Sequence, residues 1–191
     1  MRIASSMVML FVLQTSASIF EIDLWPGEGI PVFEATSQQL QLHELPSASS
    51  RVSQILNVSA GQRISFDDTR YRTTQAGRIR ASVNGAVMGR MIGNANHLSR
   101  DSYYRGKFAP ANVEVRSGTS FEYLQYRAEG NCFVRIDGNV IETWPCPTIE
   151  KSKFETIAEP KIEWWIHVID DKAQGWLLAV DANVKQLKRE F

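Results

Sequence analysis

The sequence predicts an all-β protein made of small barrel-like or sandwich-like units. Apolar residues recur with a period of two over short stretches, as at Leu40 and Leu42, which places them on one face of a strand. The breaks between these stretches carry Gly, Pro, Asn or Asp, the residues that tight turns favour. The strongest strand signal is the aromatic and aliphatic run at 163–169.

Two sets of predicted strands flank a region of different composition. The first set covers residues 30–35, 40–45, 58–66 and 71–79. Residues 82–111 are rich in Gly and Asn, and we expect a connector there with at most one short helical turn. The second set covers residues 113–115, 121–126, 132–136, 140–141, 163–169 and 176–178. Asp137-Gly138 predicts a tight hairpin within the second set, because this pair tolerates the positive φ angles of such turns.

The end of the chain predicts a short C-terminal helix over residues 181–191. Val184, Leu187 and Phe191 lie at helical spacing, and Asp181 is a suitable N-cap. Basic residues in the last turn would suit the helix C-terminus.

The first 18 residues have the layout of a secretory signal peptide. A basic start at Arg2 precedes an apolar run over 3–13, and small residues follow at 15–18. Cleavage after Ala17 or Ser18 fits best, and a buried N-terminal strand or helix is the alternative. The run is shorter than the roughly 20 residues that a membrane span needs. We therefore expect a periplasmic or secreted protein without stable membrane insertion after signal removal.

The charge balance argues against nucleic acid as a partner. The 191 residues include 21 basic and 21 acidic side chains, so the formal net charge is zero. A neutral chain has no general attraction to polyanions or to anionic lipid.

The two cysteines, Cys132 and Cys146, predict one disulfide. An isolated even pair usually bonds in an oxidising compartment, and two buried thiols are the alternative. No His cluster or second Cys pair accompanies them, so we expect no metal and no cofactor.

Two segments of the chain share a weak sequence pattern, and one of them lies in a region that resembles a known family. Gly77-Arg78-Ile79-Arg80-Ala81 and Gly175-Trp176-Leu177-Leu178-Ala179 share a pattern that could also arise by chance. Trp165-Ile166-His167-Val168, a polar turn and Gly175-Trp176-Leu177 resemble the C-terminal half of bacterial Src-homology-3-like (SH3-like) domains. Residues 58–66 are similar to the central strand pair of that family, and residues 30–32 to its opening strand.

This resemblance implies two SH3-like barrels in tandem. The first unit would span residues 19–81, residues 82–111 would connect the units, and the second unit would span 112–191 with the Cys loop. The first unit departs from the pattern, because Tyr71 stands where a Trp is usual and Arg78 replaces the Trp that follows the glycine. These departures weaken the expectation of a ligand groove in the first unit.

The titratable residues give no convincing catalytic set. His43, His97 and His167 are scattered, and a structural role is favoured for His167 over that of a catalytic base. Asp67 and Asp68 are adjacent, so a strand would point them to opposite sides and prevent an acid–base pair.

Aromatic residues are the remaining binding candidates. A shallow groove could be lined by Trp164, Trp165, Trp176, Tyr123 and Tyr126, and a packed core is the alternative. Because Trp164 and Trp165 are neighbours on one strand, they point to opposite faces, and we expect one of them to face solvent.

These observations predict a non-catalytic binding module of the cell envelope. The family resemblance implies peptidoglycan or a protein or peptide partner as the ligand. An accessory subunit of an envelope complex that uses its strand edges is the first alternative. An enzyme of unrecognised type is the second.

Overall fold

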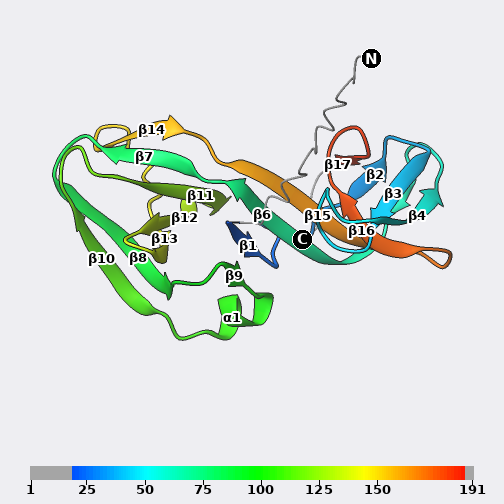
Figure 1. The fold of residues 1–191 in the computed structure, drawn as a ribbon, viewed down its shortest axis with the longest axis horizontal. Helices are drawn as coiled ribbons and strands as arrows, with labels where there is room; N and C mark the ends of the chain where they lie inside the picture. The colour runs from blue at the N-terminus through cyan, green and yellow to red at the C-terminus, as the bar shows by residue number, and fades with distance from the viewer. Residues whose placement is uncertain (1–18, 188–191) are drawn as a thin grey trace, which may run out of the picture.

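The computed structural model describes residues 19–187, which form an elongated, two-lobed, mostly β molecule (Figure 1). Two long strands, β6 (Phe66–Gln75) and β15 (Lys161–Ile169), connect the lobes. The predicted signal peptide, 1–18, lies outside the described residues. Among the described residues, no helix is both long and apolar enough to cross a membrane.

The first sheet has seven strands in the order β4-β3-β16-β15-β6-β1-β9. Besides β6 and β15, these strands are β1 (Phe20–Ile22), β3 (Gln39–His43), β4 (Val52–Asn57), β9 (His97–Leu98) and β16 (Gln174–Leu178). All neighbours are antiparallel except β1 and β9.

A three-stranded sheet completes the first lobe, in the order β17-β2-β5. Its strands are β2 (Phe33–Ala35), β5 (Arg63–Ile64) and β17 (Val184–Gln186). Phe33 and Val184 from this sheet share one apolar core with Leu42, Ile166 and Leu177 from the first sheet. The first lobe therefore closes around a core built from both ends of the described chain.

The second lobe contains the other seven-stranded sheet, in the order β10-β8-β13-β12-β11-β7-β14. The strands are β7 (Gly77–Ala81), β8 (Gly85–Gly93), β10 (Ala109–Val115), β11 (Ser120–Ala128), β12 (Asn131–Ile136), β13 (Asn139–Thr143) and β14 (Phe154–Ala158). The short helix α1 (Arg100–Arg105) begins at the N-cap Ser99, whose hydroxyl accepts a hydrogen bond from the Ser102 backbone N–H. One core is formed by side chains of this sheet's own strands. A second core lies between this sheet and β1, where Phe20 meets Phe133.

The all-β class is confirmed, and the strands are shared in an order that the sequence did not indicate. β15 pairs with β6, β16 pairs with β3, and β17 pairs with β2. Strands from the predicted second unit thus join strands from the predicted first unit. The chain leaves the first lobe after β6 and re-enters it at β15. The residues between, 77–158, contain β7 to β14.

The predicted connector is wrong, because residues 82–111 contain β8, β9, α1 and the start of β10. β8 is an interior strand with hydrogen-bonded neighbours on both sides. Gly89 in β8 lies against β13, where a Cβ would collide with the backbone carbonyl of Glu142. The glycine that suggested a loop is therefore required by close packing of two strands.

The predicted C-terminal helix is also wrong for the part of the tail that the structure describes. Residues 184–186 form β17, which pairs with β2. Val184 is buried in the first-lobe core, so tertiary packing and backbone pairing prevail over the helical spacing of the apolar residues. Residues 188–191 lie outside the described residues.

The predicted disulfide is confirmed. Cys132 and Cys146 are bonded, with their Cα atoms 5.3 Å apart, and both are fully buried. The bond fastens the segment after β13 to β12.

Candidate functional site

The two adjacent tryptophans of β15 are largely packing residues. Trp165 is fully buried, its ring edge contacts His43, and its Nε1–H donates to Glu163 over 2.9 Å. Trp164 is half-buried, and its Nε1–H donates to Thr69 Oγ1 over 2.8 Å. Its ring meets Phe33 at a centroid distance of 5.1 Å.

The other predicted aromatic residues are divided between the two sheets. Trp176 in β16 is half-buried between the His167 ring and the Arg70 guanidinium. Tyr123 and Tyr126 belong to β11 in the other seven-stranded sheet, where Tyr123 is buried and Tyr126 is exposed. The structure brings the three tryptophans onto neighbouring strands of one sheet but does not bring the two tyrosines to them.

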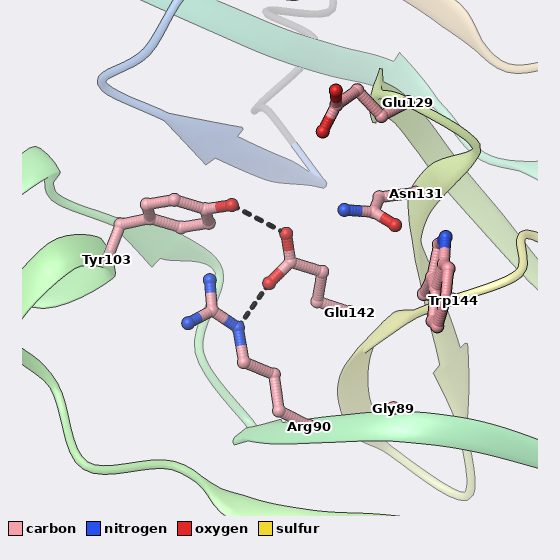
Figure 2. A pocket seen from close by; sticks show the side chains of 7 residues that line it. All are labelled: Gly89, Arg90, Tyr103, Glu129, Asn131, Glu142 and Trp144. Atoms are coloured by element: carbon pink, nitrogen blue, oxygen red, sulfur yellow. Dashed lines mark hydrogen bonds and ion pairs between the residues drawn. The ribbon is translucent and has the colours of Figure 1, made fainter.

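A hollow in the second lobe assembles a different set of side chains (Figure 2). It has a volume of about 730 Å³ and collects residues from β8, α1, the β11–β12 turn and the end of β13. Its lining residues are Gly89, Arg90, Tyr103, Glu129, Asn131, Glu142 and Trp144. We call this feature the Trp144 hollow.

A buried carboxylate is fixed beside the hollow. Glu142 is only 6% exposed, and it accepts a 2.7 Å hydrogen bond from the Tyr103 hydroxyl and another from Arg90 Nε. The Arg90 guanidinium also lies 4.4 Å from the Tyr103 ring centroid and 5.1 Å from that of Phe108. Charge-assisted hydrogen bonds and cation–π contact therefore hold Glu142, Arg90 and Tyr103 in one arrangement.

Burial raises the pKa of Tyr103, and its hydrogen bond to Glu142 raises it further. A phenol beside a carboxylate is hard to ionise, because a second negative charge would then be placed next to the first. Tyr103 therefore stays a hydrogen-bond donor to Glu142 at neutral pH.

Trp144 stands at the edge of the hollow with an unusually exposed ring. It is 67% exposed, whereas its backbone is tied down by a hydrogen bond from its N–H to the Met88 carbonyl. Two residues later, the disulfide holds Cys146, whose N–H donates to the Gly130 carbonyl in the β11–β12 turn. A large aromatic side chain is therefore presented to solvent from a fastened segment.

The sequence interpretation missed Trp144 as a site residue. The aromatic candidates that the sequence suggested all lie in predicted strands, and Trp144 lies outside those strands. The available signal was local, because Trp144 directly precedes Pro145-Cys146-Pro147, where prolines and a disulfide restrict the backbone.

Two histidine–carboxylate pairs lie outside the Trp144 hollow. His97 Nε2 lies 2.6 Å from Asp23 Oδ1, and His167 Nδ1 lies 2.7 Å from Asp67 Oδ1. His97 is exposed and His167 is half-buried beneath Trp176. Within residues 19–187, no group of three or more His, Cys, Asp or Glu side chains is placed to hold a metal ion.

Comparisons with protein families, curated proteins and solved structures find no match. The geometry of the Trp144 hollow is therefore the basis on which a role can be assigned.

Proposed function

We propose that this chain is an exported, non-catalytic binding module of the cell envelope that holds a cell-wall polymer or a peptide partner at the Trp144 hollow. The observation that carries the proposal is the exposed Trp144 ring beside the fixed Glu142–Arg90–Tyr103 cluster. Exposed aromatic residues at the edge of a preformed hollow are typical anchors of binding sites, because they bury a large area with little loss of conformational freedom.

The bonding of Glu142 favours binding over catalysis. Tyr103 occupies one of its carboxylate oxygens and Arg90 the other. A general acid or base must be able to exchange a proton with a substrate, and a carboxylate held on both oxygens is better suited to positioning its neighbours.

Export is supported by the bonded cysteine pair. Disulfides persist mainly in oxidising compartments such as the periplasm or the extracellular space. The proposed signal peptide at 1–18 would supply the route to such a compartment.

An SH3-like barrel belongs to the same proposal, as one interrupted unit. The segments that carried the resemblance, 30–32, 58–66 and 165–177, lie in the first lobe, where Ile64, Ile166 and Leu177 share one core. In this arrangement the second lobe is an insertion that carries the Trp144 hollow.

The test is retention of purified mature protein on insoluble cell-wall sacculi in a sedimentation assay. Trp144→Ala should abolish retention and leave the thermal melting curve nearly unchanged, because the ring makes little buried contact. Leu45→Ala is the matched control, since Leu45 is 64% exposed but belongs to the first lobe. Trp176→Ala tests the site expected from the sequence.

Full retention of Trp144→Ala together with loss of retention by Trp176→Ala would move the site to the first lobe and contradict the proposal. Failure of the wild-type protein to bind sacculi, with recovery in a defined envelope protein complex, would favour the accessory-subunit alternative.

A further inference from the structure

A second hollow adjoins the Trp144 hollow and shares three of its lining residues. It has a volume of about 390 Å³, and the shared residues are Tyr103, Glu129 and Asn131. Its other lining residues are Trp25, Gly27, Glu28, Gly29, Ile30, Tyr104, Arg127 and Ala128. The two hollows therefore lie side by side, and together we call them the groove, which is bordered by α1 and by the β11–β12 turn.

The far wall of the groove is built and held by arginines. Arg127 Nη1 donates to the carbonyls of Trp25 and Gly27 over 3.0 and 3.1 Å. The Arg127 carbonyl accepts from the Gly27 N–H, and the Arg100 guanidinium lies 5.2 Å from the Trp25 ring centroid. Segment 25–29 is therefore fastened to β11, so this wall is as preorganised as the Trp144 end.

Unpaired polar atoms gather behind the wall of the groove. Among residues 19–187, four buried side-chain polar atoms make no hydrogen bond, and three of them lie in or against the groove. These three are Asn131 Oδ1, Arg127 Nε and Arg100 Nη2. Buried polar groups are normally hydrogen-bonded, so the wall of the groove is an unusually polar part of the interior.

Aromatic rings lie at both ends of this polar stretch. Trp144 is 67% exposed at one end, and Tyr104 is 66% exposed at the other. Trp25 lines the second hollow beside Tyr104. Between them lie the amide of Asn131 and the carboxylate of Glu129, which together offer donors and acceptors in planar groups.

We propose that the groove binds an uncharged oligosaccharide chain, with one sugar ring on Trp144 and another at the Trp25–Tyr104 end. This inference rests on the proposed function and names the ligand class. A pyranose ring presents apolar C–H groups on its faces and hydroxyls on its edges, which matches aromatic platforms flanked by planar polar side chains. Two adjoining hollows, each of pocket size, exceed what a single sugar ring fills.

The charges of the groove favour a neutral ligand. Arg90 is committed to Glu142, and Arg127 is committed to backbone carbonyls of segment 25–29. With Glu129 and Glu142 also present, the groove has no basic excess that would attract a polyanion.

The strands behind the groove disfavour a peptide bound as an added strand. β8 pairs with β10 and β13, and β12 pairs with β11 and β13. Strand addition needs an open sheet edge, and neither of these strands offers one.

The experiment is calorimetric titration with N-acetylglucosamine and its β-1,4-linked oligomers of increasing length. Affinity should rise about tenfold or more as the chain extends from one hollow into the next and then level off. Trp144→Ala should weaken binding of every oligomer. Tyr104→Ala should weaken only the longer ones, and Trp176→Ala should change none.

Indole N–H signals in a nitrogen–proton correlation spectrum supply an independent readout on the folded wild-type protein. The Trp144 and Trp25 signals should shift on adding the longest oligomer, and the buried Trp165 signal should not. This readout remains decisive if a substitution lowers the yield of folded protein.

Absence of binding and of shifts with every oligomer would overturn the oligosaccharide inference. If the wild-type protein still sediments with sacculi, the proposed function stands and a peptide component of the wall becomes the ligand. Affinity that does not depend on chain length would overturn the inference that one oligosaccharide occupies both hollows. Oligomer binding without retention on sacculi would leave the groove intact and remove the cell-wall part of the proposed function.

Discussion

Replacement of Glu142 by Ala tests whether the cluster beside the Trp144 hollow is held by its buried carboxylate. The change removes the acceptor of the Tyr103 hydroxyl and of Arg90 Nε. Both bonds involve the charged carboxylate, and a hydrogen bond to a charged group contributes about 1.5–3 kcal/mol. The Arg90 side chain is 35% exposed and regains water, which reduces the loss. We expect the free energy of unfolding to fall by about 2–3 kcal/mol.

The measurement is equilibrium urea unfolding of the oxidised protein. Glu155→Ala is the matched control, because Glu155 also pairs with an arginine, Arg80, but both side chains are about half exposed. Exposed ion pairs contribute roughly 0–1 kcal/mol, so this variant should be nearly as stable as the wild type. Glu142→Gln keeps an oxygen acceptor for Tyr103 and should fall between the two.

The reasoning would be refuted by a Glu142→Ala variant whose stability lies within about 0.5 kcal/mol of Glu155→Ala. That result would mean that Tyr103 and Arg90 find equivalent partners in water and that the carboxylate does not fix the hollow. A double-mutant cycle with Arg90→Ala would then show no coupling between the two positions.

Three further predictions concern the core, the disulfide and the phenols. Trp165→Ala should lower the free energy of unfolding in urea by about 3–5 kcal/mol, because the ring is fully buried. Trp144→Ala should lower it by less than about 1 kcal/mol. Equal losses would contradict the packing described. Reduction of the disulfide, which closes a loop over a separation of 14 residues, should cost about 3 kcal/mol, measured as the difference between unfolding curves with and without reductant. Burial is the largest cause that raises the pKa of Tyr71, Tyr103 and Tyr123. Above about pH 10 the folded state therefore binds more protons than the unfolded state. The free energy of unfolding should then fall as pH rises. Urea midpoints at pH 9 and 11 measure this fall, which Tyr103→Phe should reduce.

The features that could be predicted from the sequence depend on local patterns. Alternation at Leu40 and Leu42 predicted a strand with one buried face, and both side chains are fully buried in β3. Asp137-Gly138 predicted the hairpin that joins β12 to β13. The disulfide followed from the expected compartment and from the isolation of two cysteines. In each case a few neighbouring residues carry the signal.

The features that could not be predicted depend on which distant segments pair. Alternation in β15 assigns its side chains to faces but does not identify β6, residues 66–75, as one of its two neighbours. Gly89 looked like loop composition because the requirement for glycine comes from the Glu142 carbonyl, which lies 53 positions further on in the sequence, on β13. The Trp144 hollow was missed for the same reason, since its lining comes from four separate segments.

The long pair formed by β6 and β15 explains how one chain carries two lobes. Their register runs from the Phe66–Val168 pair in the first lobe to the Gln75–Lys161 pair, where residues 77–158 begin and end (Figure 1). The second lobe therefore starts and finishes at adjacent points of one sheet. Further contacts join the two seven-stranded sheets: Thr73 of β6 donates its hydroxyl hydrogen to the Leu124 carbonyl of β11, and Phe20 of β1 packs on Phe133 of β12. Because β1 continues directly into segment 23–30, the same contacts that join the sheets also place Trp25 opposite α1. The groove thus lies where the two sheets meet, and its walls are fixed by the join between them.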